Sequence, residues 1–444
     1  MEFSSALRIL DRSTGEAISG RFPGRLERMA ALLRHLGNPE RKFASVHVGG
    51  TAGKGSTATM CAAILSEAGY KVGLHTKPHL HSVIERARIG NVPISEEGFG
   101  EVFERLAATI EEMRATEWGP PSYFELLVAL AFTYFAQEAV DVAVVEVGVG
   151  GLLDGTNLIV PKVSVITNVG TDHKDVLGDT VEQIAKDKAG IIKEGVPVVT
   201  AAEQPSVLRI IEDAARDRSA PLTVVQKAAR VESTVSDVSY VQSVRVQTAA
   251  QAYEFTLPLI GEFQATNAAT AILACEQIQD AFSFTPQTVA RALSTLSLPG
   301  RTEYYPSRPA LLFDVAHNVE KAAALRGAIE RHFPERRLVF VVAIAEDKDG
   351  AGVVGAWRGL PAQYIFTTFD VSHRKSRHAR SLVNIAEDAG MVSRAVDDPI
   401  EALNLARRIA SAPDMVVVTG STFLVGALRR WFLENSAVAD RAGV

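Results

Sequence analysis

A glycine-rich segment that contains one lysine, His47–Thr57 (HVGGTAGKGST), is the strongest sign of chemistry in the 444-residue chain. It follows an apolar run and precedes a helical pattern, so we expect a strand, a loop and a helix. Glycines let backbone N–H groups close around phosphate oxygens, a helix N-terminus favours anions, and Lys54 adds a positive charge. The segment departs from the standard G-x-x-x-x-G-K-[ST] pattern, because Val48 takes the first glycine position and Gly55 follows the lysine. A plain glycine turn is the alternative, but the surrounding pattern favours a phosphate-binding loop.

An acidic residue, Glu146, lies near the end of the apolar run Val142–Val147, which is followed by glycines. Burying an unpaired carboxylate is very costly, so this side chain needs a partner. Magnesium held near the phosphates of the loop would supply one. A structural carboxylate that accepts hydrogen bonds from neighbouring amides is the alternative. A dinucleotide fingerprint is excluded, because Leu153 stands where the third glycine of G-x-G-x-x-G belongs.

A third candidate, His173, follows the apolar run Val163–Asn168, and Lys188 lies on the helical pattern after it. The carboxyl ends of parallel strands are where open α/β sheets bind ligands. We therefore weigh a site role for His173 evenly against that of an ordinary surface or structural histidine. Lys188 taken alone is typical of a solvated surface.

Strand-like and helical patterns alternate along the chain, which predicts parallel sheets covered by helices. The predicted strands are Ala44–Val48, Val72–Thr76, Val142–Val147, Val163–Asn168, Val196–Thr200, Leu311–Val315, Leu338–Ile344, Gln363–Thr368 and Met415–Thr419. The predicted helices include Thr57–Ala68, Glu97–Met113, Tyr123–Gln137, Val181–Ile192, Ala265–Gln279, Val319–His332 and Ile400–Ser411. The alternating stretch Ala229–Leu257 predicts antiparallel strands appended to the first sheet. A turn-forming break at residues 297–300 divides the chain into residues 1–298 and 299–444.

Composition excludes several classes of protein. Lysine and arginine total 46 against 52 aspartates and glutamates, which argues against broad binding to nucleic acid. The 2 cysteines cannot build a disulfide framework and fit a reducing compartment. No signal peptide is visible, and no apolar stretch approaches the roughly 20 residues that span a bilayer. We expect a cytoplasmic protein without a membrane partner, and a monomer.

Taken together, the segments resemble the folylpolyglutamate synthase and dihydrofolate synthase family of the Mur ligase superfamily. The resemblance rests on GTAGKGS, HTKPHLHSVIERARIG, SYFELLVALAF, DVAVVEVGVGGLLDGTN, TNVGTDHKDVLG, KDKAGIIKEGVPVV, LPGR, DVAHN, EDKD and VTGSTFLVGALRR, in the order of the family. It implies an α/β protein with two domains: a P-loop-type parallel-sheet ATPase domain with the added antiparallel segment, and a Rossmann-like C-terminal glutamate-ligase domain.

The resemblance also implies roles for single residues. The phosphates of ATP would be surrounded by Gly50, Thr51, Gly53, Lys54, Gly55 and Ser56. Glu146 and His173 would hold Mg²⁺, and Lys188 resembles the carbamylated lysine whose added carboxylate helps to assemble the metal and acyl-phosphate site. Substrate contacts would come from Phe124, Asp154 and Asn157 near a pterin ring, and from Lys348 and Ser421 near the amino acid or the interdomain cleft. The nucleotide would also meet Arg301, Asp314, His317 and Asn318 from the C-terminal domain.

Two positions depart from the family pattern. Ala52 replaces an asparagine, and Lys77 replaces a serine whose hydroxyl would bind Mg²⁺. An ammonium has no lone pair and cannot bind a metal ion. Because Lys77 follows the strand Val72–Thr76, we expect its ammonium to contact the β- and γ-phosphates beside the loop.

The leading hypothesis is an ATP-dependent ligase that adds L-glutamate to a folate or dihydropteroate carboxylate through an acyl phosphate. A carboxylate is a poor electrophile, and transfer of the γ-phosphoryl group gives it a leaving group. Two alternatives stay open: a ligase for another carboxylate acceptor, and a nucleotide-binding relative that has lost catalysis.

Overall fold

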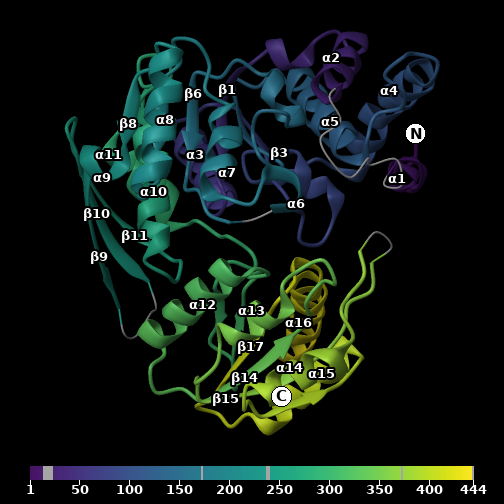
Figure 1. The fold of residues 1–444 in the computed structure, drawn as a ribbon, viewed down its shortest axis with the longest axis vertical. Helices are drawn as coiled ribbons and strands as arrows, with labels where there is room; N and C mark the ends of the chain where they lie inside the picture. The colour runs from purple at the N-terminus through teal and green to yellow at the C-terminus, as the bar shows by residue number, and fades with distance from the viewer. Residues whose placement is uncertain (14–23, 172–173, 237–240, 372–373, 443–444) are drawn as a thin grey trace. The chain divides into compact units, whose positions relative to one another are not determined.

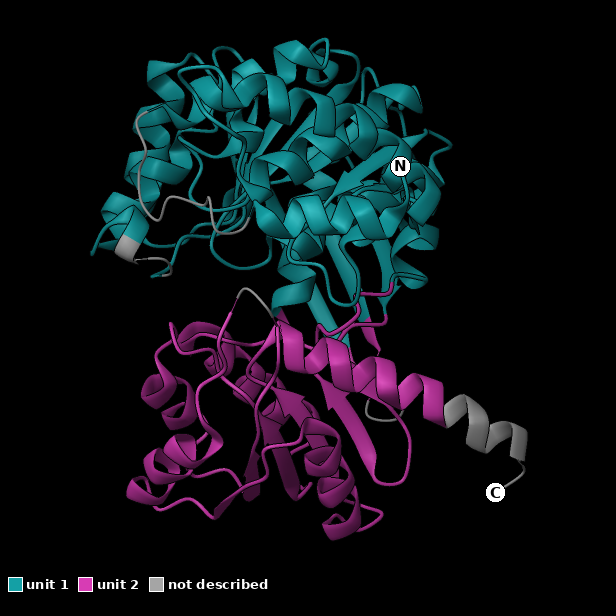
Figure 2. Ribbon diagram, turned by 90° about the vertical axis from the view of Figure 1, so that its right-hand side faces the viewer, with its two compact units in different colours: residues 1–234, 243–257, 263–296 teal, residues 235–242, 258–262, 297–444 magenta. Residues whose placement is uncertain are grey.

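The computed structural model describes residues 1–13, 24–171, 174–236, 241–371 and 374–442 (Figure 1). The chain divides into two compact units, which Figure 2 shows in separate colours. Unit 1 comprises residues 1–234, 243–257 and 263–296, and unit 2 comprises residues 235–242, 258–262 and 297–444. Most of unit 2 is therefore the segment from Ser297 onward, and two short internal segments also belong to it.

An eight-stranded sheet in the order β4-β3-β2-β5-β1-β6-β7-β8 forms the centre of unit 1. Its strands are β1 Ala44–Gly49, β2 Val72–His75, β3 Arg88–Ile89, β4 Val92–Pro93, β5 Val142–Glu146, β6 Val163–Ile166, β7 Val198–Thr200 and β8 Leu222–Val224. The six strands from β2 to β8 are parallel, and β3 and β4 add an antiparallel edge. Every residue of β5 is buried, as its continuous apolar run predicts for a strand covered on both faces.

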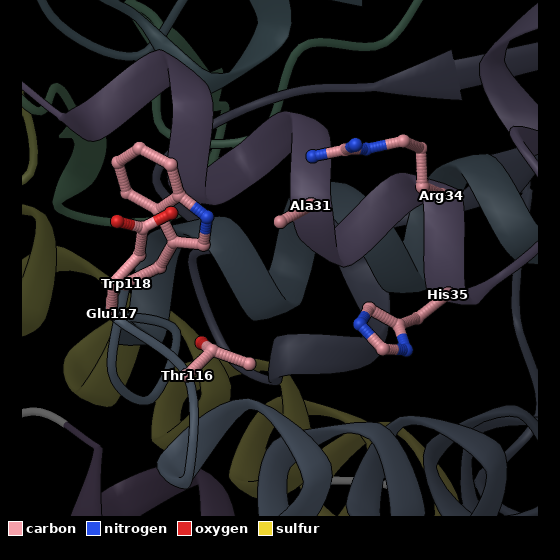
Figure 3. A pocket seen from close by; sticks show the side chains of 6 residues that line it. All are labelled: Ala31, Arg34, His35, Thr116, Glu117 and Trp118. Carbon is pink, nitrogen blue, oxygen red and sulfur yellow. The ribbon is translucent and has the colours of Figure 1, made fainter.

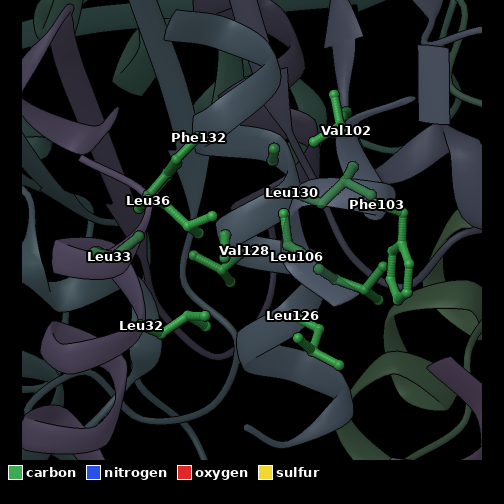
Figure 4. Close-up of a cluster of buried hydrophobic side chains, with 14 of the residues drawn as sticks. Leu32, Leu33, Leu36, Val102, Phe103, Leu106, Leu126, Val128, Leu130 and Phe132 are labelled. Atoms are coloured by element: carbon green, nitrogen blue, oxygen red, sulfur yellow. The ribbon is translucent and has the colours of Figure 1, made fainter. Parts of the chain in front are cut away.

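Helices cover both faces of this sheet. They are α1 Phe3–Arg12, α2 Arg25–His35, α3 Lys54–Glu67, α4 Glu96–Arg114, α5 Tyr123–Gln137, α6 Lys174–Leu177, α7 Val181–Ala189, α8 Pro205–Asp217, α9 Val225–Ala228, α10 Phe263–Glu276 and α11 Pro286–Ser294, with short 3₁₀ turns at η1 Pro39–Arg41, η2 Val83–Arg86 and η3 Gly155–Leu158. A large apolar cluster joins α1, α2, α4 and α5 to β5, and Figure 4 shows some of its leucines and phenylalanines. Within it, Arg28 Nε donates to Glu125 Oε2 at 3.0 Å, which ties α2 to the first turn of α5.

The antiparallel segment differs in one respect from its prediction. Strands β9 Ala229–Val235, β10 Gln242–Thr248 and β11 Ala252–Leu257 form a separate three-stranded sheet and do not extend the eight-stranded one. Alternate residues of β10 are buried and exposed, so one face needs a cover. Helix α11 packs on β11 and supplies part of that cover.

A six-stranded sheet in the order β12-β13-β17-β14-β15-β16 forms the centre of unit 2. Its strands are β12 Glu303–Tyr305, β13 Ala310–Phe313, β14 Leu338–Val342, β15 Ala362–Phe366, β16 Ser393–Ala395 and β17 Met415–Thr419. Its helices are α12 Val319–His332, α13 Gly350–Gly355, α14 Ala379–Asp388, α15 Pro399–Ile409 and α16 Thr422–Ala442. All neighbouring strands are parallel except β12 and β13. The predicted two-domain α/β fold is confirmed.

Candidate active site

The glycine-rich loop connects β1 to α3 and needs glycine at two positions. Gly50 and Gly53 have φ angles of 138° and 78°, in the left-handed region. A Cβ atom on Gly50 would lie 2.0 Å from Thr167 Oγ1, and one on Gly53 would lie 2.4 Å from Asn267 Oδ1. A side chain at either position would clash with a neighbouring polar group, so the loop requires glycine at both.

The strand next to β1 holds the loop in place. Thr51 N–H donates to the carbonyl oxygen of Asn168 at 2.9 Å, and Ala52 N–H donates to Asn168 Oδ1 at 2.8 Å. Thr167 Oγ1 donates to the Ala52 carbonyl oxygen at 2.6 Å. Gly55 and Ser56 begin α3, where free backbone N–H groups and the helix dipole favour anions.

Two lysines converge on one backbone carbonyl of the loop. Lys54 Nζ donates to the oxygens of Gly50 and Thr51 at 3.0 and 3.2 Å. Lys188 Nζ, from α7, donates to the same Gly50 oxygen at 2.8 Å, and its residue is only 4% exposed. The structure thus brings together two residues that are 134 positions apart in the sequence, 188 against 54. A capping box between Thr180 and Gln183 begins the helix that carries Lys188.

Glu146 ends β5 beside the loop, with 3% of its surface exposed. Its Oε2 accepts a hydrogen bond from the backbone N–H of Lys77 at 3.0 Å. A Cβ on Gly55 would lie 3.2 Å from the same oxygen, so the first turn of α3 lies against the carboxylate. The carboxylate caps an amide, as the structural alternative expected, and it also faces the loop. His173, its predicted partner at a metal ion, lies outside the described residues.

Lys77 follows β2 and is a half-buried cation close to Lys54 and Glu146. Burial lowers the pKa of Lys77 to about 8, the positive charge of Lys54 lowers it further, and Glu146 opposes this shift. Its ammonium makes no hydrogen bond or ion pair with any residue that the structure describes. This location beside the loop is compatible with the predicted phosphate contact.

The residues predicted to contact a pterin ring flank the chain just after β5. A Cβ on Gly148 would lie 2.3 Å from Phe124 Cζ and 2.6 Å from Asp154 Oδ2, so these two side chains meet there. Asp154 accepts hydrogen bonds from Val149 N–H at 2.9 Å and Thr156 N–H at 3.0 Å. Asn157 Nδ2 instead donates to the carbonyl oxygens of Leu152 and Gly190. Phe124 and Asp154 are thus together, whereas Asn157 ties this segment to the end of α7.

Sequence reasoning missed two histidines and an asparagine. His47 Nε2 lies 2.8 Å from Thr156 Oγ1, and His75 Nδ1 donates to the Arg86 carbonyl oxygen at 2.7 Å. Burial lowers their pKa values to about 3 and about 4, so both rings are neutral at pH 7. A polar residue inside an apolar strand was the available signal. Asn267 on α10 had none, because its contact with the loop depends on how α10 packs on α3.

In unit 2, three predicted residues cluster where β13 ends. Asp314 accepts hydrogen bonds from the N–H groups of Thr302 and Ala316, both at 2.8 Å. Burial raises the pKa of Asp314, while Arg301 and the backbone hydrogen bonds oppose the shift. The Asn318 side chain accepts from Lys321 N–H and caps α12.

The remaining predicted residues of unit 2 follow the two neighbouring strands. Ser421 comes after β17 and accepts a hydrogen bond from Phe423 N–H at 3.2 Å. Lys348 comes after β14, and its carbonyl oxygen accepts from Arg377 Nη2 at 2.9 Å. His317 Nδ1 donates to the Val315 oxygen at 2.8 Å beside them. All lie on the carboxyl side of adjacent strands in one sheet.

A cavity of about 510 Å³ lies elsewhere in unit 1, between α2 and the segment after α4 (Figure 3). Its lining consists of Ala31, Arg34, His35, Thr116, Glu117 and Trp118. None of the predicted site residues lines it. Among the described helices, none is long and apolar enough to cross a membrane.

Comparison with known proteins identifies the family of the chain. Residues 48–275 match the Mur ligase middle domain, and residues 300–422 match the Mur ligase glutamate ligase domain. A dihydrofolate synthase/folylpolyglutamate synthase of Bacillus subtilis is 33% identical over 414 residues, covering 92% of this chain and 94% of that protein. The protein of the same name from Mycobacterium tuberculosis is 33% identical over 443 residues, covering 92% and 90%.

Solved structures with bound nucleotide share the fold. The Mycobacterium tuberculosis folylpolyglutamate synthase complexed with ADP has a TM-score of 0.89 at 29% identity, covering 97% of this chain and 99% of that one. Escherichia coli FolC in complex with DHPP and ADP has a TM-score of 0.86 at 27% identity, covering 98% and 99%. On the strength of the loop, the fold and these relatives, the chain belongs to the folylpolyglutamate synthase and dihydrofolate synthase family of the Mur ligases.

Proposed function

We propose that this protein is an ATP-dependent ligase that joins L-glutamate to the carboxylate of a folate or dihydropteroate through an acyl phosphate. The observation that carries the proposal is the convergence of Lys54 and Lys188 on the Gly50 carbonyl oxygen, beside the carboxylate of Glu146. The names of the relatives supply the substrate class.

The proposed first step moves the γ-phosphoryl group of ATP to the acceptor carboxylate. Such a transfer depends chiefly on positioning and on neutralising the phosphate charge. Lys54 supplies a positive charge, and the N–H groups that begin α3 supply hydrogen-bond donors. The amine of glutamate then attacks the acyl carbon, phosphate leaves, and an amide forms.

The residues present fit a magnesium ion at the loop. Mg²⁺ at nucleotide sites is usually held by one or two carboxylates together with phosphate oxygens and water. Glu146 is a buried carboxylate at this place, and only its Oε2 takes a hydrogen bond from the described chain. When bound, the ion would neutralise charge on the phosphates during transfer.

Lys188 has a second proposed role, as a carbamylated lysine. Carbamylation would replace its ammonium by a carbamate, which carries a negative charge and keeps one N–H. That N–H retains a donor for the Gly50 oxygen, which Lys188 Nζ contacts at 2.8 Å. Two cations, Lys54 and Lys77, lie at the same loop to balance the new charge.

The assignment of binding roles to the two parts of the chain is part of the proposal. Residues 1–298 bind ATP and the acceptor, with Phe124 as the aromatic wall and Asp154 and Asn157 beside it. Residues 299–444 bind glutamate through Lys348 and Ser421, and Arg301, Asp314, His317 and Asn318 contribute to the nucleotide, as the family resemblance implies. The proposal includes a cytoplasmic monomer that needs no nucleic acid or membrane.

The test is glutamate-dependent release of ADP by the purified protein, with dihydropteroate and folates as acceptors. We expect ADP release only when ATP, glutamate and one of these acceptors are all present. If ADP is released only with a different carboxylate, the protein is a ligase for another class of acceptor. If the protein binds nucleotide but releases no ADP under any of these conditions, it is a nucleotide-binding protein and the ligase proposal is wrong.

A further inference from the structure

Arg86, at the end of η2, is a buried arginine that the site described above does not use. Its residue is 7% exposed, and its carbonyl oxygen accepts the hydrogen bond from His75 Nδ1 in β2. Two residues further along the chain from His75, Lys77 donates its backbone N–H to Glu146. The His75 ring also lies 6.5 Å from the ring of Phe124, centroid to centroid. Arg86 therefore adjoins, through His75, the segment that contacts both Glu146 and the predicted aromatic wall, and it interacts electrostatically with Glu146.

The guanidinium of Arg86 has unused donors. Its Nε donates to His79 Nδ1 at 3.1 Å, which fixes the plane of the group. Within the described part of the chain, its two terminal nitrogens have no acceptor and the group forms no ion pair. Neither terminal nitrogen is sealed from solvent, so both donors are open to a ligand. A fixed guanidinium with open donors is suited to binding an anion.

Neighbouring arginines show that the missing partner is not a general feature of this region. Arg28, equally buried, is paired with Glu125. Arg88 lies 3.9 Å from Glu85, whose carboxylate also accepts three backbone N–H groups of residues 80–82. The nearby carboxylate is thus committed to Arg88 and to the loop, and Arg86 is left for another anion.

Positive charge is in excess at this edge of the sheet. Lys54, Lys77 and Arg86 lie close to Glu146, and Lys77 interacts electrostatically with the other two cations. Lys54 contacts the glycine-rich loop and so is placed for the triphosphate. Arg86 interacts electrostatically with Tyr123 in the first turn of α5, next to Phe124.

We propose that Arg86 binds the reacting carboxylate of the acceptor. The planar fork of an arginine matches a carboxylate with two parallel hydrogen bonds, which a lysine cannot do. The group to be phosphorylated would then lie between the aromatic wall and the cations that face ATP. This inference rests on the proposed function, because it assumes that the acceptor ring lies against Phe124.

The test compares binding of pteroate with binding of its carboxamide, which lacks the negative charge, in the absence of glutamate. In the unchanged protein we expect pteroate to bind about tenfold or more tightly than the carboxamide. Arg86→Gln should lower pteroate affinity to the level of the carboxamide and leave the affinity for the carboxamide and for ADP within about twofold. Arg86→Lys should retain part of the preference, because it keeps the charge and loses the fork.

Arg88→Gln is the matched control, since it removes a charge from the same segment and should leave the preference intact. Circular dichroism spectra and thermal melting of all variants establish that they are folded. A preference for pteroate that survives in folded Arg86→Gln overturns the inference alone. Loss of ADP or ATP affinity in place of pteroate affinity overturns it too, and assigns Arg86 to the phosphates. If the unchanged protein binds neither probe, the proposed function fails and the inference fails with it.

Discussion

Predicted site residues lie at the carboxyl edges of the parallel strands in both units, but their side chains make different kinds of contact. In unit 1, Lys54 and Lys188 reach a shared backbone oxygen across the loop, and the half-buried Lys77 and the buried Arg86 lie near Glu146. In unit 2, the side chains of Asp314, Asn318 and Ser421 accept hydrogen bonds from backbone N–H groups of the same unit.

This difference separates two ways of building a site. The edge in unit 1 brings the positive charges of Lys54, Lys77 and Arg86 together near Glu146, an arrangement that an anionic ligand would stabilise. The edge in unit 2 uses its polar groups to hold the local backbone, so its shape is preserved without a ligand. We therefore expect substitutions in unit 1 to remove activity more than stability, and those in unit 2 to affect stability as well.

The largest effect is expected for Lys54→Ala. Removing a charge-assisted contact to a phosphate should cost about 1.5–3 kcal/mol of nucleotide binding or more, and turnover should be abolished. Lys54 Nζ also donates to the Gly50 and Thr51 oxygens, which are only partly buried, so the free energy of unfolding should fall slightly while the fold is kept. Titration with ATP and denaturant unfolding measure the two quantities. Near-normal ADP production by Lys54→Ala would contradict a role of the loop in the reaction.

Lys188→Ala should also abolish turnover, since it removes the proposed carbamate and the contact with Gly50. A small carboxylic acid added in solution should restore part of the activity by entering the vacated space. Lys186→Ala, at an exposed position of the same helix, is the control and should retain activity. Full activity of Lys188→Ala without additives contradicts this role.

Lys77 should have an intermediate effect on nucleotide binding. Lys77→Ala should weaken ATP binding, whereas Lys77→Ser should preserve turnover and increase its dependence on magnesium, because a hydroxyl can bind the ion. Burial lowers the pKa of Lys77 to about 8, so its positive charge is present below that pH and lost as the pH rises through it. ATP affinity should therefore fall between pH 7 and pH 9, estimated from that pKa, and fall less in Lys77→Ala.

Two results would contradict the role of Lys77. One is normal ATP binding by Lys77→Ala together with unchanged metal dependence in the serine variant. The other is an identical pH profile for the alanine variant and the unchanged protein, measured as the dissociation constant for ATP.

The smallest effect on chemistry and the clearest effect on stability are expected for Asp314→Ala. The N–H groups of Thr302 and Ala316 lose their acceptor, which should lower the free energy of unfolding by about 1–3 kcal/mol. Asp314→Asn keeps one acceptor oxygen and should lose less. Urea unfolding tests both variants. An unchanged midpoint for Asp314→Ala would show that substitutions in unit 2 affect stability no more than those in unit 1.

Much of the fold was predictable because its central strands are continuous apolar runs, as in β1, β5 and β17. Short strands such as β3 and β4 have two residues each and show no periodicity. The separation of the three-stranded sheet was not predictable. An alternating pattern shows which face of a strand is buried, but it does not show which element packs against that face.

The candidate site was predictable where local sequence carries it. The loop around Lys54 and the acid at the end of β5 are of this kind. Asn267 and Arg86 are not, because each acquires its role from elements that are distant in the sequence. The unpaired state of Arg86 depends on Glu85 being taken by Arg88 and the loop, which only the folded structure displays.

The central claim, that ATP activates the acceptor carboxylate as an acyl phosphate, has one direct measurement. Dihydropteroate labelled with ¹⁸O in its carboxylate is incubated with the protein, ATP, Mg²⁺ and glutamate, and the products are analysed by mass spectrometry. The account predicts an amide-linked glutamate product and transfer of one ¹⁸O per turnover to inorganic phosphate. Product without label in phosphate, or label in AMP, would contradict it.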